Sequence, residues 1–317
     1  MLVKFDAETG EGKELAKQHQ VNGYPTFLLA NADAVTMDTW SGYGKDFFIA
    51  ELGTALADPT TIGEKKERFA KAPGAADAAK LARYHDTRSE YAQAVDLYVR
   101  AEELDPKANY KFDILGATAG GFRSEAYTKD DVRKAADALF ASENVAPVHY
   151  IRAVSMLRGV GRQAEDDAFT VPYLEPALAK TAGSTDPAVQ AQRVSLEIDR
   201  ALLIEKDTDK AYGLKLASMP EGWKDEPGRL NGFAWWCFEN EVQLAEAEAL
   251  ARRGVELSPA GPDRAQILDT VAEICNARGN CDDAIALIQQ AMADAPDSEY
   301  YPKQLARFQE IRADQVN

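Results

Sequence analysis

No apolar run in this 317-residue chain approaches the roughly 20 residues that a membrane-spanning helix needs. The chain also does not open with a basic segment and an apolar core, the pattern of a secretory signal. Positive charge is scarce, because 36 Lys and Arg stand against 52 Asp and Glu, giving a net charge of −16. A chain this acidic repels phosphate backbones and anionic lipid surfaces. The sequence therefore predicts no nucleic-acid partner and no membrane span.

Metal-binding and nucleophilic residues are also few. The chain has three cysteines and three histidines, namely Cys237, Cys275, Cys281, His19, His85 and His149. None of the cysteines forms a Cys-x-x-Cys pair, and no Cys/His group has zinc spacing. Gly-x-Ser-x-Gly and His-Glu-x-x-His motifs do not occur. We therefore expect no metal, no cofactor and no catalytic residues that are complete within this chain.

The first 60 residues alternate between strand-like and helical patterns. Residues 2–6 form a short apolar run that ends in an acid, and an amphipathic segment follows at residues 12–18. After Gly23-Tyr24-Pro25-Thr26 come two apolar runs around a polar turn, residues 26–30 and 34–40, and then a helical stretch, residues 46–56. This pattern predicts the order strand, helix, strand, strand, helix.

This order around Tyr24-Pro25-Thr26 resembles the C-terminal two-thirds of a thioredoxin fold. The resemblance implies that the Tyr24–Pro25 bond is cis and that Tyr24, Pro25 and Thr26 form the wall of a substrate site. In that family the proline faces a Cys-x-x-Cys motif, which would lie upstream of Met1. The alternative is an ordinary trans bond. A cis bond is accessible here because proline lowers the preference for the trans bond to roughly 0.5–1 kcal/mol.

A second pattern repeats along the rest of the chain. Its members are small or large apolar residues at fixed offsets followed by proline, and they are Ala94, Tyr98, Ala101 and Pro106, then Ala247, Ala251, Gly254 and Pro259, then Ala284, Ile288, Ala291 and Pro296. Small residues allow the two helices of a hairpin to approach closely, and proline ends the second helix. The pattern resembles the second helix of a tetratricopeptide repeat.

Helical patterns without clear repeats fill the middle of the chain. The predicted helices are residues 129–142, 147–159, 172–181, 187–204 and 208–217, and a final helix covers residues 300–316. The predicted fold class is α/β plus all-α, a partial thioredoxin-like domain followed by a tetratricopeptide-like α-solenoid. The predicted boundaries are a first domain at 1–58, a bridging helix at 59–74 and a repeat array at 75–317.

Two features of the C-terminal part have alternative interpretations. Cys275 and Cys281 flank a short turn, so they are candidates for a structural disulfide, or they are small apolar residues that fill the core. Trp235 and Trp236 either anchor a peptide, or one faces the core and its neighbour is partly exposed.

The sequence suggests two functions. The resemblance implies a parent thiol–disulfide oxidoreductase whose Cys-x-x-Cys precedes this chain, which would be inactive alone, in the periplasm or cell envelope of a bacterium. The alternative is a protein-interaction scaffold, in the envelope or in the cytoplasm. Under both hypotheses the helical array binds a protein or peptide partner. The sequence predicts no oligomeric state.

Overall fold

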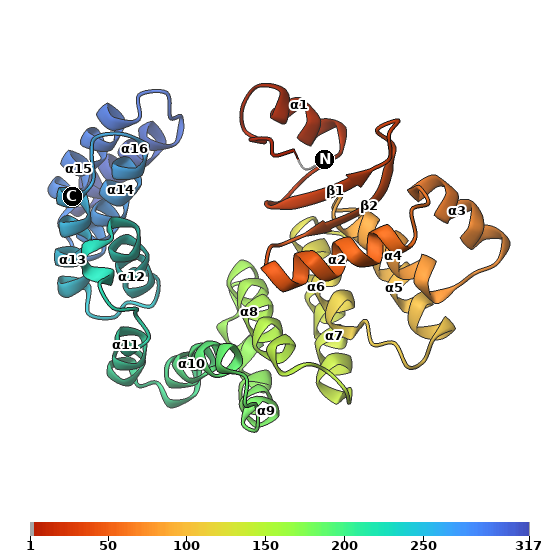
Figure 1. Ribbon diagram of the computed structural model, residues 1–317. Helices are drawn as coiled ribbons and strands as arrows, with labels where there is room; N and C mark the ends of the chain where they lie inside the picture. Colours follow the sequence, from red (N-terminus) through yellow and green to blue (C-terminus); the bar gives the residue numbers. More distant parts are fainter. Residues whose placement is uncertain (1–2, 317) are drawn as a thin grey trace. The chain divides into compact units, whose positions relative to one another are not determined.

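The computed structural model describes residues 3–316, and its chain divides into two compact units, Met1–Arg193 and Val194–Asn317. Helices dominate both units, and the strands of the described residues lie only near the N-terminus (Figure 1). Residues 1–58 belong to the same compact unit as the helices that follow them. The two units are described separately below.

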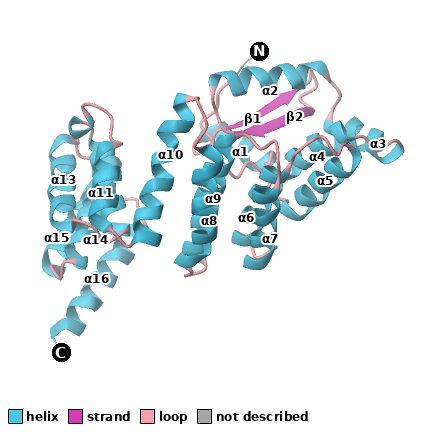
Figure 2. Cartoon of the chain, turned by 90° about the horizontal axis from the view of Figure 1, so that it is seen from below, coloured by secondary structure: helices cyan, strands magenta, loops and turns pink. Residues whose placement is uncertain are grey.

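A β-hairpin and two helices begin the first unit. They are α1 (Gly10–Gln18), β1 (Thr26–Ala30), β2 (Thr36–Ser41) and α2 (Lys45–Ala57). The two strands pair antiparallel (Figure 2). Thr26 lies opposite Ser41. The ring of Phe27 stacks on Trp40 at 5.6 Å and packs against Phe48 at 4.9 Å. These three aromatic rings join both strands to α2.

The prediction of a thioredoxin-like α/β domain is wrong. Within the described residues the sheet has two strands, β1 and β2, and residues 3–6 form no strand. Val3 and Phe5 are exposed instead of packing in a sheet. An apolar run becomes a strand only where it finds an edge to pair with, and residues 3–6 pair with neither strand of the hairpin. The fold is therefore an array of helices with a small hairpin.

Helices make up the rest of the first unit. They are α3 (Ile62–Lys71), α4 (Ala75–Asp86), α5 (Tyr91–Leu104), α6 (Lys111–Arg123), α7 (Lys129–Ala141), α8 (Pro147–Gln163), the 3₁₀ turn Asp167–Thr170, α9 (Val171–Thr181) and the start of α10 (Pro187–Arg200), a helix that continues past Arg193 into the second unit. Helices α4 and α5 form a hairpin, and α5 then packs on α6 and α6 on α7.

Local sequence explains where several of these helices begin. Thr61 and Glu64 form a capping box at the start of α3, and Thr128 and Asp131 form another at α7. Proline occupies the first turn of α8, where its missing N–H removes no helical hydrogen bond. The helices predicted between residues 129 and 217 are confirmed to within a few residues at their ends.

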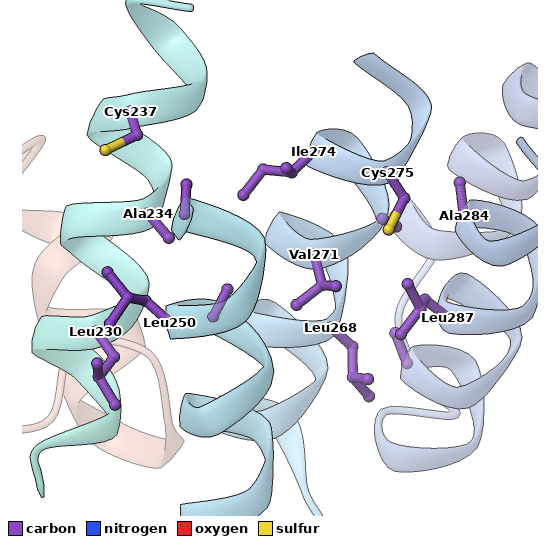
Figure 3. Packing of buried hydrophobic residues seen from close by; sticks show 14 of the residues in the cluster. Leu230, Ala234, Cys237, Leu250, Leu268, Val271, Ile274, Cys275, Ala284 and Leu287 are labelled. Carbon is purple, nitrogen blue, oxygen red and sulfur yellow. The ribbon is translucent and has the colours of Figure 1, made fainter. Parts of the chain in front are cut away.

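The second unit continues with helices that pack on their neighbours. They are the end of α10, the π-helical turn Ala201–Glu205, α11 (Thr208–Ala217), the 3₁₀ turn Trp223–Asp225, α12 (Pro227–Glu239), α13 (Leu244–Leu257), α14 (Pro262–Ala277), α15 (Cys281–Asp294) and α16 (Tyr300–Val316). One hydrophobic core runs through α12 to α16. Figure 3 shows Leu230 and Ala234 of α12, Leu268 and Val271 of α14 and Leu287 of α15 within this core.

The predicted repeat positions are confirmed as the buried faces of the second helices α5, α13 and α15. Their apolar members are all buried, and each of these helices ends two residues before the proline of the pattern. Gly254 shows why the small residue is needed. A Cβ atom there would lie 3.3 Å from Ile267 and 3.4 Å from the backbone oxygen of Pro227. Helix α13 therefore packs close to both α12 and α14.

Candidate interaction surfaces

The Tyr24-Pro25-Thr26 segment leads into the hairpin, and Tyr24 and Pro25 are exposed to solvent. The predicted cis bond between Tyr24 and Pro25 is confirmed. Tyr24 is exposed, and Thr26 begins β1 with its Oγ1 donating to the carbonyl of Gly23 at 2.6 Å. No cysteine lies nearby in sequence, because the three cysteines all come after residue 236. The role of the segment as a substrate wall stays a prediction.

The disulfide interpretation of Cys275 and Cys281 does not hold in this structure. Neither cysteine forms a disulfide and both are buried, as is Cys237. Arg252 donates to the sulfur of Cys275 at 3.4 Å, and the thiol of Cys281 donates to Asn276 Oδ1 at 3.2 Å. Cys275 lies in the core between α14 and α15 (Figure 3). The cysteines therefore act as small core residues, the alternative that the sequence also left open.

The chain is expected to show no disulfide reductase activity. Burial raises the pKa of Cys237 to about 12 and that of Cys275 to about 11, so both stay protonated at neutral pH. The thiolate is the nucleophile in thiol–disulfide exchange, and a buried thiol supplies almost none. The test is insulin reduction with dithiothreitol as the electron donor. A rate well above the uncatalysed background that disappears in Cys275→Ser or Cys281→Ser would contradict this expectation.

The two adjacent tryptophans of α12 have different environments. Trp236 packs on the core of the second unit and lies near the ring of Phe233 at 6.2 Å. Trp235 is exposed, and its ring is 5.1 Å from that of Phe238. The interpretation of one core-facing and one partly exposed tryptophan is confirmed.

Exposed apolar side chains concentrate at the N-terminus of the first unit. Nine of the fifteen large apolar residues that are exposed in the described part of the chain lie between residues 3 and 56, and they are Val3, Phe5, Tyr24, Leu28, Val35, Tyr43, Phe47, Ile49 and Leu56. We call these nine residues the N-terminal apolar surface. Their density within this short part of the chain makes it the candidate interaction surface of the first unit.

A group of charged residues attaches the hairpin to α4. Asp38 of β2 is buried and pairs with Lys80 and Arg83 of α4. Arg83 also pairs with Glu51 of α2. These ion pairs hold the hairpin and α2 against the helical array. This group could not be found in the sequence. Asp38 lies more than 40 residues before Lys80 and Arg83, and the charged residues form no motif.

A second charged group joins α14 to α16. Asp269 and Glu273 of α14 are both buried. Tyr300 donates to Asp269 Oδ2 at 3.2 Å, whereas Asp269 Oδ1 has no hydrogen-bond partner among the described residues. Glu273 accepts from Gln304 at 3.0 Å and also pairs with Arg307. Burial, followed by the charge of Glu273, raises the pKa of Asp269 to about 6.

Replacing Asp269 by asparagine is expected to stabilise the protein at pH 7. The folded state binds the Asp269 proton more tightly than the unfolded chain, whose pKa is near 3.8. Stability therefore falls as pH rises from about 4 to about 6, and the cost above pH 6 is on the order of 1–3 kcal/mol. Urea denaturation at pH 4.5 and pH 7 measures the difference. Asp269→Asn should flatten this dependence, whereas the exposed control Glu256→Gln should not. An unchanged pH dependence in Asp269→Asn would contradict the assignment.

The described residues contain no group of His, Cys, Asp and Glu side chains that could hold a metal ion. Among the helices of residues 3–316, none combines the length and the apolar character that crossing a membrane requires.

No protein-family model matches this chain, and no curated protein matches it. Several solved structures are similar. A tetratricopeptide repeat protein from Parabacteroides merdae has 14% identity and a TM-score of 0.49, over 84% of this chain and 96% of that chain. The Pseudomonas aeruginosa pilF structure has 15% identity and a TM-score of 0.44, over 74% of this chain and 96% of that chain. The Cut9–Hcn1 structure has 13% identity and a TM-score of 0.44, over 77% of this chain and 44% of that chain.

This chain thus spans less than half of the Cut9–Hcn1 chain that it matches. At these identities and TM-scores, the similarities transfer no partner and no activity. The helical-repeat architecture follows from this chain's own hairpins and their buried Ala and Gly positions.

Proposed function

We propose that this chain is a protein-interaction scaffold that binds a partner protein through its first unit. The observation that carries the proposal is the N-terminal apolar surface, since nine exposed apolar side chains lie within residues 3–56. Fully burying a large apolar side chain is worth about 1.5–3 kcal/mol, and these side chains are about half exposed, so each one that a partner covers contributes on the order of 1 kcal/mol. The stacked helical hairpins supply a rigid support for this surface.

The free edge of the hairpin supports the same proposal. Strand β1 pairs only with β2 within the described residues, so its other edge has unpaired backbone groups. The carbonyl of Pro25 accepts from the N–H of Gly42 at 2.9 Å, and Thr26 lies opposite Ser41. Because hydrogen-bonded and free positions alternate along an antiparallel pair, the backbone of Thr26 and Leu28 faces the free edge. An extended segment of a partner could add to the sheet there.

Site-specific photo-crosslinking tests the proposal. A photoreactive amino acid replaces Tyr43, which is 68% exposed, and in a control replaces the exposed Glu256 of the second unit. In extracts of the source organism we expect one discrete adduct from position 43 and none from position 256. Introducing Phe47→Asp together with Ile49→Asp should abolish the adduct while the far-ultraviolet circular dichroism is unchanged. The same adducts at both positions, or no adduct at position 43, would contradict the proposal.

A further inference from the structure

The two strands of the hairpin have different surroundings. Residues 37–40 of β2 are all buried, whereas no residue of β1 is buried and Leu28 is exposed. Strand β2 also packs on α2, α3 and α4. Within residues 3–316, the only strand that pairs with β1 is β2. The edge of the sheet that solvent can reach is therefore the outer edge of β1.

Side chains occupy backbone groups of β2. The ammonium group of Lys65 donates to the carbonyl oxygen of Met37 at 3.2 Å. Alternation along the antiparallel pair turns the N–H of Thr39 to the outer edge of β2, where it donates to Asp38 Oδ1 at 2.8 Å. Ion pairs with two basic residues of α4 hold the Asp38 carboxylate in place. These contacts close the outer edge of β2 to a further strand.

The outer edge of β1 is open. The same alternation turns the N–H and C=O groups of Thr26 and Leu28 to this edge. The hydroxyl of Thr39 donates to the carbonyl oxygen of Phe27 at 3.0 Å, which agrees with Phe27 facing β2. A register shift near the end of β1 interrupts the regular pairing there. The backbone groups that can accept a new strand are therefore those of Thr26 and Leu28.

Strand β1 lacks the charges that protect many edge strands. Natural sheets often block an exposed edge with charged side chains, especially lysine. Residues 18–32 contain no Asp, Glu, Lys or Arg, and this range includes the whole of β1. The side chain of Leu28 is 37% exposed on this strand. An uncharged edge with an exposed apolar residue pairs readily with another strand.

We propose that an extended, uncharged segment of a partner protein pairs with β1 as a third strand of this sheet. Hydrogen bonds from its backbone to Thr26 and Leu28 hold the segment. Successive residues of a strand point to opposite faces, so apolar side chains of the segment contact Phe27 on one face and Leu28 on the other. This inference rests on the proposed scaffold function and names the chemistry of the partner.

Charge favours a different protein over a second copy of this chain. Two copies would each carry a net charge of −16 and repel each other. The surroundings of β1 also disfavour a charged segment. The ring of Phe27 packs on Trp40 at 5.6 Å and on Phe48 at 4.9 Å, and a charged side chain beside these rings would lose hydration without gaining an ion pair. The segment is therefore apolar and uncharged where it meets β1.

The experiment measures amide hydrogen exchange of the full chain by NMR, with a synthetic peptide as the probe. The probe is acetyl-Thr-Val-Tyr-Val-Thr-amide, and its control has the same side chains but an N-methyl group at every residue, which removes the backbone donors. In the free protein we expect the amides of Thr26 and Leu28 to exchange faster than those of Phe27 and Leu29, which face β2. The probe should slow exchange at Thr26 and Leu28 saturably, and the N-methylated control should not.

Two variants separate backbone pairing from side-chain contact. Leu28→Pro removes the N–H that faces outward but no hydrogen bond to β2, and it should weaken the probe by about tenfold or more. Leu28→Ala keeps that N–H and should weaken the probe by about threefold. Exchange at Thr26 reports binding, and slow exchange at Phe27 shows that the hairpin is intact in each variant. Equal losses in the two variants, or no saturable effect at Thr26, would overturn strand pairing.

A charged probe tests the chemistry of the segment without changing the protein. Replacing both Val residues of the peptide by Asp should weaken it by about tenfold or more. Equal affinity of the two peptides would overturn the proposal of an uncharged segment. If exchange at Thr26 in the free protein slows as the protein concentration rises, the edge binds a second copy, and the choice of a different partner is overturned.

The partner captured at Tyr43 separates this inference from the scaffold proposal. We expect Leu28→Pro to reduce the adduct at position 43 by about tenfold or more. An adduct that is indifferent to Leu28→Pro would overturn strand pairing and leave the scaffold proposal standing. Probe binding at β1 without any captured partner would support strand pairing and count against the scaffold.

Discussion

Replacing Phe233 by alanine is expected to destabilise the second unit by about 3–5 kcal/mol. The side chain is 1% exposed in the core of α12 to α16. Its ring contacts those of Trp223 at 4.9 Å and Tyr212 at 5.6 Å, so the substitution removes aromatic contacts and leaves a cavity. Urea denaturation followed by tryptophan fluorescence measures the effect, since three of the four tryptophans lie in this unit.

Trp235→Ala is the matched control for this prediction. Trp235 is a larger aromatic residue on the same helix, but it is 36% exposed. Its replacement should cost about 1 kcal/mol, mainly through the lost contact with Phe238. Equal losses in the two variants would mean that α12 packs on the core through a different face.

Replacing Lys65 by methionine is expected to cost about 2–4 kcal/mol. Lys65 of α3 is 1% exposed. Its ammonium donates to the backbone oxygens of Met37 at 3.2 Å and Asp58 at 3.3 Å, and to Thr60. Methionine fills a similar volume but leaves these acceptors without a donor. Because Met37 belongs to β2, the loss should loosen the hairpin from the helices of the first unit, which thermal and urea denaturation can measure.

Lys71→Met is the control for Lys65. Lys71 ends the same helix, its side chain is 81% exposed, and its ion pair with Glu67 is 3.9 Å long. This substitution should change stability by less than about 0.5 kcal/mol. If Lys65→Met were equally neutral, Lys65 would not be the link between α3 and the hairpin.

The helical repeats could be predicted because their signal is local. Ala94, Ala247 and Ala284 each lie a fixed distance before a proline, and that spacing marks the second helix of a hairpin wherever it occurs. The strand prediction for residues 2–6 is wrong for residues 3–6, which the structure describes, because an apolar run does not reveal whether a strand edge is available to it. The resemblance to a thioredoxin fold rested on the order of elements, whereas the sheet depends on pairing between distant segments.

The candidate binding site could not be predicted from the sequence. The exposure of Phe47 and Ile49 depends on how α2 packs against β2, which leaves no local signal in the sequence. Lys65 was part of a charged stretch that the sequence assigned to a helix, and that assignment is confirmed. Nothing in the sequence indicates that Lys65 is buried. The ammonium group donates to backbone oxygens in β2 and in the segment before α3, and any residue type carries such an oxygen.

Hydrogen exchange of the full chain, with and without the partner captured at Tyr43, tests the scaffold proposal most directly. In the free protein we expect weak protection in residues 3–57 and strong protection in residues 230–293. The partner should add protection to residues 26–57, with no change in residues 230–293. Protection gained only in residues 230–293, or in no segment, would contradict the account.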